Sequence, residues 1–187
     1  AIKGGYNLRL FFYSIRYSED LDIDIQIIQK STLENKVNKL LLSPALLKLL
    51  QGYQITKISY SSPKQTQTTQ RWKIQLHTSR SVMPLPTKIE FSRRQHTFHN
   101  QLDTITMRIC QQYHLPPLYL SHYGISDAVL QKIFALANRS STQARDVFDL
   151  HHLIHLEPCY QLCIAKNVLK QAKEASEQED NAQLAKE

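Results

Sequence analysis

The sequence has no long hydrophobic run. Nowhere among its 187 residues do about 18 apolar side chains follow one another, so we expect no transmembrane helix. No signal-peptide pattern is found at its start. Cysteine is scarce, and the three that occur form an odd, sparse set. This argues against a disulfide scaffold and favours a reducing compartment, the cytoplasm.

Acidic residues are also few. Asp and Glu together number 16 against 23 Lys and Arg, which gives a formal net charge of +7 and a pI of about 9.3. This balance favours a polyanionic partner such as RNA, DNA or nucleotide phosphates. The alternative is an ordinary basic soluble protein.

Local patterns predict a mixed α/β (α+β) lobe over residues 1–95 and an all-helical lobe over 96–187 that ends in a frayed tail. Ser31 and Glu34 have the spacing of a capping box, and Ser43-Pro44 is typical of a second helix start, with Gly52 as its stop. We predict strands over residues 53–60, 71–77 and 87–92, and a polar loop over 61–70. We predict later helices from about 126, over 142–157 and over 160–175.

The most informative segment is an acidic strand. From Asp20 to Ile27 polar and aliphatic residues alternate, so Asp20, Asp22 and Asp24 share one face. Like charges in a row on one face repel each other unless a cation lies beside them. Carboxylates two residues apart on a strand suit Mg²⁺, which takes oxygen ligands. The alternative is an exposed edge strand with an acidic face.

A second strand repeats this pattern. Lys88, Glu90 and Ser92 share a face, so Glu90 could add a third carboxylate to Asp20 and Asp22. The alternative is an ordinary Lys–Glu surface strand. The following Arg93 and Arg94 could hold phosphate or RNA backbone.

Gly4-Gly5 precedes a short helical segment. A backbone without Cβ atoms that leads into a helix N-terminus presents free N–H groups and the positive dipole end, which suits a phosphate. The alternative is a simple turn. The glycines followed by a short helix and then by the acidic strand indicate a phosphate site beside a metal site. This combination is more specific than the glycine pair or the acidic strand alone.

A third cluster lies on two later helices. Lys132 and Arg139 are two helical turns apart and project from a common side. A lysine here could neutralise a transferring triphosphate, with an Asp orienting it or acting as a base. Arg145 and Asp149 at i,i+4 are also consistent with a surface ion pair.

His151, His155, Cys159 and Cys163 recur every four residues, as zinc ligands on one helix could. Pro158 interrupts that helix, and ligands so spaced extend too far to close one tetrahedron. We therefore interpret the stripe as ordinary core or surface residues.

Taken in order, these segments resemble the AbiEii/AbiGii toxin family of nucleotidyltransferases, within the DNA-polymerase-β-like superfamily. The family typically has Lys-Gly-Gly-Thr-Ala-Leu, then Arg-Phe-Ser-Glu-Asp-Leu-Asp-Phe, a strand with Lys/Arg-x-Glu/Asp, a helix with Lys, and Arg-Asp-x-x-Asp-Leu. The matching segments here are residues 3–5, 16–23, 88–90, 132–139 and 145–150.

The resemblance implies a nucleotidyltransferase, the toxin of a bacterial toxin–antitoxin pair, that transfers NMP from a nucleoside triphosphate (NTP) to an RNA such as tRNA. An antitoxin protein is the implied partner. Asp20, Asp22 and Glu90 would hold Mg²⁺ or Mn²⁺. Lys132 would contact nucleotide phosphates, and Asp146 or Asp149 would complete the catalytic set. The implied nucleotide-binding residues are Gly4, Gly5, Tyr6, Lys88, Arg139 and Arg145.

Tyr6 departs from the family pattern, which has a small hydroxyl residue there. A Tyr side chain could occlude the phosphate seat or stack on the base. Two alternatives therefore stay open: a degenerate nucleotidyltransferase that binds RNA or protein, and an enzyme that transfers a nucleotide or a phosphate to a protein.

Overall fold

The structure is a computed structural model that describes residues 1–93, 99–138, 141 and 143–156. None of the helices in these ranges is both long and apolar enough to cross a membrane. The elements in chain order are β1 (Ile2–Lys3), α1 (Gly4–Phe11), β2 (Asp20–Asp24), α2 (Lys30–Leu41), α3 (Pro44–Gln51), β3 (Ile55–Gln65), β4 (Thr69–Thr78), β5 (Ser81–Ser92), β6 (Asn100–Thr104), α4 (Met107–Tyr113), β7 (Tyr119–Tyr123), α5 (Ile125–Ala137) and α6 (Ala144–Leu156).

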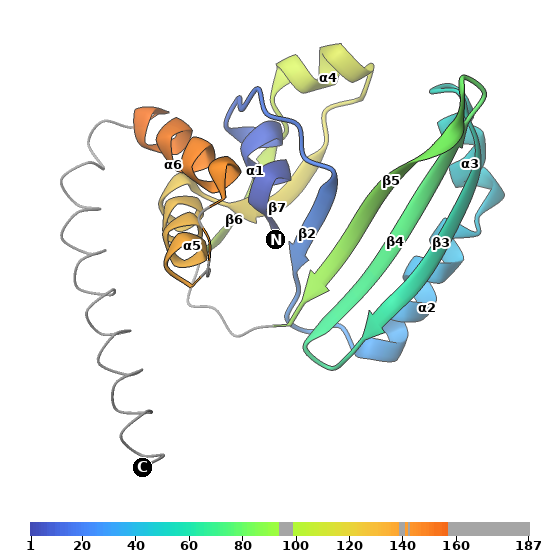
Figure 1. The fold of residues 1–187 in the computed structure, drawn as a ribbon, viewed down its shortest axis with the longest axis horizontal. Coiled ribbons are helices and arrows are strands. Elements are labelled where there is room, and N and C mark those ends of the chain that lie inside the picture. The colour runs from blue at the N-terminus through green and yellow to red at the C-terminus, as the bar shows by residue number, and fades with distance from the viewer. Residues whose placement is uncertain (94–98, 139–140, 142, 157–187) are drawn as a thin grey trace. The chain divides into compact units, whose positions relative to one another are not determined.

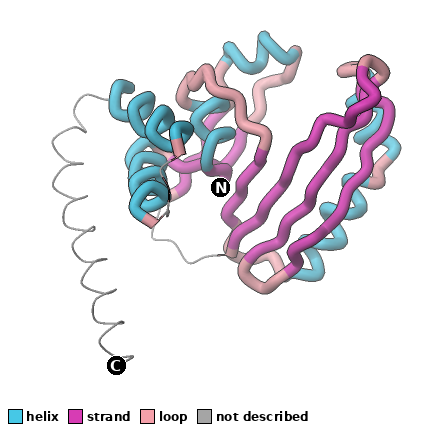
Figure 2. The backbone as a smooth tube through the Cα atoms, viewed as in Figure 1, coloured by secondary structure: helices cyan, strands magenta, loops and turns pink. Residues whose placement is uncertain are grey.

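The strands form one mixed sheet. Its order is β3-β4-β5-β2-β1-β7-β6, so the acidic strand β2 lies in the interior of the sheet (Figure 2). β2 runs parallel to β5 and antiparallel to β1, and β3, β4 and β5 form an antiparallel meander. This confirms the mixed α/β character and excludes the interpretation of β2 as an edge strand.

Helices α2 and α3 lie over one face of β3, β4 and β5 (Figure 1). Leu33, Val37 and Leu41, spaced four residues apart, form one buried stripe of α2. They pack with Trp72 and Ile74 of β4, which are also buried. Burying each such side chain contributes roughly 1.5–3 kcal/mol, which fixes this face of the meander as the covered one.

The predicted loop over residues 61–70 is wrong. β3 continues through Gln65 and β4 starts at Thr69, and the Thr66 amide donates to the Thr69 carbonyl over 2.9 Å. Pro63 is compatible with β3 because β3 is an edge strand with a register shift between Ser61 and Lys64. Only residues 66–68 form a turn, and the polar residues 61–65 belong to the end of β3.

The helix starts were predicted with mixed success. α2 begins at Lys30 after Gln29, and no side chain caps it, so the capping box at Ser31 is wrong. α3 begins at Pro44 and ends immediately before Gly52, as predicted.

The expectation that only helices follow residue 95 is wrong, because β6 and β7 belong to the sheet. Ile2 of β1 pairs with the buried His122 of β7, which a local pattern does not reveal. The chain divides into Ala1–His122 and Tyr123–Glu187, whereas the sequence placed a boundary near residue 95. Within the described part of the second unit, α5 and α6 pack together and match predicted helices. The helix predicted over 160–175 lies outside the described residues.

Candidate active site

The carboxylates of the first unit are brought together by strand register. β2 and β5 are parallel neighbours in which Asp20 pairs with Lys88 and Asp22 with Glu90. Residues paired in this way project from the same face of a sheet. On its other side β2 neighbours β1, and Lys3 pairs with Asp22. The structure thus brings Asp20, Asp22, Lys88 and Glu90 to one face, as the sequence predicted.

Cationic side chains compensate these acids. Lys88 Nζ lies 2.9 Å from Asp20 Oδ2, Arg71 Nε donates to Glu90 Oε2 over 2.6 Å, and Lys3 Nζ lies 2.5 Å from Asp24 Oδ1. These pairs offset the repulsion expected between neighbouring acids.

Asp22 has the most perturbed environment of the set. Burial raises the pKa of its carboxyl, and the nearby charges of Glu90 and Asp20 raise it further, while Lys88 and Lys3 act in the opposite direction. Burial and like charges both disfavour the ionised form. A carboxylate held in this way gains from a cation that enters beside it.

The glycine pair lies directly against the acidic strand and the loop before it. Gly4 has φ of +67°, and a Cβ there would approach Asp22 Oδ2 to 3.3 Å. A Cβ on Gly5 would lie 2.7 Å from an Arg16 guanidinium nitrogen and 2.9 Å from Ser18 Cβ. Glycine is thus favoured at Gly5 by close approach and at Gly4 by the left-handed backbone.

The pair also starts helix α1. Lys3 precedes the helix and its side chain makes no capping bond. The first N–H groups of a helix have no partner within the helix, and they attract anions together with the dipole. The N–H groups at the start of α1 therefore lie beside Asp22.

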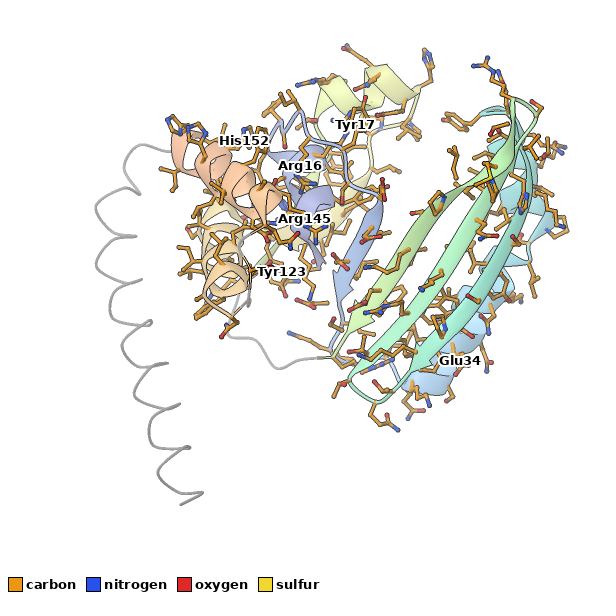
Figure 3. All side chains as sticks on the ribbon, in the orientation of Figure 1. Arg16, Tyr17, Glu34, Tyr123, Arg145 and His152 are labelled. Carbon is orange, nitrogen blue, oxygen red and sulfur yellow. The ribbon has the colours of Figure 1, made fainter. Side chains whose placement is uncertain are left out.

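Tyr6, the departure from the family pattern, follows the glycines in α1. Burial raises the pKa of its hydroxyl, and the nearby Tyr113 and Asp20 add to this effect while Arg9 opposes it. Tyr6 is half-buried. Arg16 and Tyr17 lie on the loop between α1 and β2 (Figure 3), and the Arg9 guanidinium lies 3.9 Å from the centre of the Tyr17 ring.

The second unit contains its own charged cluster. Lys132 on α5 lies 2.6 Å from Asp149 Oδ2 and 3.2 Å from Asp146 Oδ1, both on α6. The Asp149 side chain is fully buried and that of Asp146 is 3% exposed. Buried carboxylates require such compensation, so this lysine holds α5 and α6 together.

The remaining predicted residues have different outcomes. Arg145 is exposed, and Asp149, its expected ion-pair partner, is bound by Lys132. Arg93 donates to the Ile28 and Gln67 carbonyls and to the Gln70 side chain. It therefore links the segment after β2 to the β3–β4 hairpin.

The last predicted residues lie partly on α6 and partly outside the described residues. Arg94 and Arg139 lie outside the described residues. His151 and His155 are exposed on α6, and the two cysteines of the proposed stripe, Cys159 and Cys163, also lie outside the described residues.

The oxygen donors suit a hard divalent cation in type. Within the described ranges, no three acidic, His or Cys side chains already form a metal cage. Mg²⁺ commonly takes only one or two protein carboxylates and completes its shell with water and substrate phosphates. Asp20 and Asp22, beside the glycine start of α1, fit that pattern, with Glu90 adjacent to Asp22.

Sequence analysis missed four contributors to this region. Arg71 and Lys3 neutralise Glu90 and Asp24, and Arg16 and Ser18 pack on Gly5. Lys3, Arg16 and Ser18 lie inside the motifs themselves, so proximity to the motif was the available signal. Arg71 gave none, because its contact depends on the register of β4 against β5.

This arrangement of glycines, helix start and paired carboxylates on a mixed sheet is that of a nucleotidyltransferase-type domain. The sequence profile of one family, described as nucleotidyl transferase AbiEii toxin of type IV toxin–antitoxin systems, matches residues 1–186. The chain belongs to this family. No curated protein sequence matches it.

Two solved structures resemble the fold. JHP933 from Helicobacter pylori superposes with a TM-score of 0.51 and 21% identity, covering 83% of this chain and 57% of that one. A candidate nucleotidyltransferase from H. pylori gives a TM-score of 0.49 and 20% identity, covering 83% and 59%. At this identity the likeness concerns the fold, and this chain spans less than three fifths of the length of either structure.

Proposed function

We propose that this protein is a divalent-metal-dependent nucleotidyltransferase, the toxin of a bacterial toxin–antitoxin pair, which transfers NMP from an NTP to a hydroxyl of an RNA acceptor such as tRNA in the cytoplasm. The observation that carries the proposal is the register of β2 against β5. In this register Asp22 and Glu90 are direct cross-strand neighbours on the same face of the sheet, and Asp22 lies next to the glycine start of α1. Family membership supports the reaction class and the antitoxin partner.

In this reaction the acceptor oxygen forms a bond to the α-phosphorus of the NTP. The bond from that phosphorus to the β-bridging oxygen breaks, pyrophosphate leaves with the electron pair, and the hydroxyl proton passes to water. A bound Mg²⁺ or Mn²⁺, held by Asp20 and Asp22 with Glu90, would stabilise the charge on the attacking and leaving oxygens.

The protein's own residues would position the reactants. The first N–H groups of α1 would hold the triphosphate, because Gly4 and Gly5 put no Cβ between the backbone and a phosphate. Lys88 is already beside Asp20 and would gain a phosphate partner when a metal takes that carboxylate. Because little covalent chemistry is asked of the chain, orientation and charge should account for most of the rate.

The test is a labelling experiment. Purified protein is incubated with each α-labelled NTP, total tRNA and Mg²⁺, and the labelled macromolecule is identified. Asp22→Asn should reduce labelling of RNA at least about 10³-fold, because metal stabilisation of the transition state is worth several kcal/mol. The matched control is Glu34→Gln on α2, which removes a carboxylate from the helix that covers the opposite face (Figure 3).

Each outcome has a distinct meaning. Unchanged labelling in Asp22→Asn contradicts the assigned site. Label that appears in protein and not in RNA supports the protein-modifying alternative, for which the same carboxylates would serve. If wild-type protein binds neither metal nor NTP by calorimetry, the alternative of a degenerate nucleotidyltransferase that only binds RNA or protein is supported.

A further inference from the structure

Strands β3 and β4 contain no acidic residue. They do contain four lysines or arginines, and strand register assigns all four to one face. Ser61 pairs with Lys73, Lys64 pairs with Arg71, and Lys57 pairs with His77. Trp72 and Ile74, the alternate residues of β4, are buried in the core beneath α2. The basic side chains therefore project from the face opposite α2 and α3.

This open face is continuous with the candidate active site. Across the sheet, Lys3, Asp22, Glu90, Arg71 and Lys64 form one row of paired positions, because each is the register partner of the next. We call it the first row. It extends over β1, β2, β5, β4 and β3.

A second row lies beside the first. Asp20 pairs with Lys88, Lys88 with Lys73, and Lys73 with Ser61. Neighbouring strands are about 4.8 Å apart, so each row extends roughly 14 Å from the carboxylates of β2 to the edge strand β3. Counted from β2 to β3, the first row thus runs from Asp22 to Lys64 and the second from Asp20 to Ser61, from an acid to a cation or a hydroxyl.

Charge compensation stops halfway along the rows. Lys88 forms an ion pair with Asp20, and Arg71 forms one with Glu90. Lys64 and Lys73 are exposed, and no acidic side chain of the described residues pairs with either. Lys73 also lies directly opposite Lys88, where like charges on antiparallel strands destabilise the pair. An anion bound over β4 and β3, at the outer ends of the rows, would remove this repulsion between Lys73 and Lys88.

We infer that the two rows form the surface on which the acceptor RNA binds through its sugar–phosphate backbone, from the edge strand β3 towards the carboxylates; the inference rests on the proposed function. Charge complementarity favours a polyanion, since several cations share one face of β3 and β4 without an acidic residue on either strand. Neither row contains an apolar residue, whereas the centre of a protein–protein interface is depleted of charge and rich in apolar side chains. Ser61 adds a hydroxyl that can donate to phosphate oxygen.

The test measures binding without catalysis. Lys64→Glu/Lys73→Glu is compared with wild type for binding of fluorescent total tRNA and of a short single-stranded RNA, at several salt concentrations, without NTP or metal. The control, Lys36→Glu/Lys39→Glu, makes the same charge change at exposed positions of α2 on the opposite side of the meander. Melting curves establish that both variants are folded.

We expect the row variant to bind RNA at least about tenfold more weakly than the control. Its log–log salt dependence should become shallower by about 1 for each phosphate that the variant no longer neutralises. Equal binding by row variant and control overturns the inference, as does a wild type that binds neither RNA. Loss of antitoxin binding in the row variant with RNA binding intact also overturns it, since the surface would then serve a protein.

The two proposals fail in different ways. Binding does not require catalysis, so it can be repeated in the Asp22→Asn background. If RNA binding depends on the rows but wild-type protein transfers no label, the proposed reaction fails and the surface stands. If label is transferred equally well by wild type and by the row variant, the reaction stands and the surface fails.

Discussion

Lys132 Nζ lies 2.6 Å from an oxygen of Asp149, a carboxylate with no exposed surface, and also within 3.2 Å of Asp146. Two buried acids thus share one lysine that is 12% exposed. This geometry gives Lys132 a structural role in the second unit, while its contact with nucleotide phosphate stays a prediction.

Replacement of this lysine should destabilise the protein strongly. Lys132→Met removes the ammonium group that two buried carboxylates share, which we expect to cost about 3–5 kcal/mol. Lys48→Met on the exposed side of α3 should change stability by less than about 0.5 kcal/mol. Chemical denaturation measures both. Addition of Asp149→Asn should recover part of the loss, and a Lys132→Met protein as stable as wild type would show that the cluster contributes little.

Asp22 should make stability depend on pH in a defined direction. Its folded-state pKa is raised above the ordinary value of 3.8, so the folded state binds a proton more readily than the unfolded state does. Stability from this group is therefore highest below pH 3.8 and is lost as pH rises through the folded-state pKa.

Asp22→Asn removes this loss. Without metal, the variant should melt at a higher temperature than wild type at pH 7, and the difference should vanish at pH values below 3.8. Mg²⁺ should raise the melting temperature of wild type and not that of Asp22→Asn. Saturation at 100 times the Kd corresponds to about 2.7 kcal/mol. A variant less stable than wild type at neutral pH would contradict this account.

Any side chain at position 5 should lower the free energy of unfolding. In Gly5→Ala the new methyl would lie 2.9 Å from Ser18 Cβ and 2.7 Å from an Arg16 nitrogen, so the loop before β2 must shift. Overpacking of this kind costs about 1–3 kcal/mol. Gly52→Ala is the control, because the nearest atom to its Cβ, the Leu49 carbonyl oxygen, is 3.5 Å away. Equal melting temperatures for the two variants would mean that the loop adapts without cost.

Trp72 anchors the covered face of the meander. It is fully buried, and its indole N–H donates to Asn38 Oδ1 of α2 over 2.9 Å. Asn38→Ala should cost about 1–3 kcal/mol because that N–H is left without a partner in the core. In the Trp72→Phe background the same Asn38→Ala change should cost less, since no donor remains. A double-mutant cycle of unfolding free energies measures the coupling.

Short-range patterns determined much of this protein. Alternation over Asp20 to Asp24 fixed which side chains share a face, because the period of a strand is two. The proline after Ser43 and Gly52 marked both ends of α3. The order of motifs from Gly4 to Asp149 was sufficient for family assignment, because such motifs are local in sequence.

Only the tertiary structure decided which residues meet. The strand order and register that join Asp22 to Glu90, and Glu90 to Arg71, depend on strands distant in the sequence. Polarity indicates the face of a residue but not its neighbour on the next strand, so β6, β7 and the extended β3 were missed. The same limit hid the two cross-strand rows, which exist because pairing aligns charged residues from separate strands.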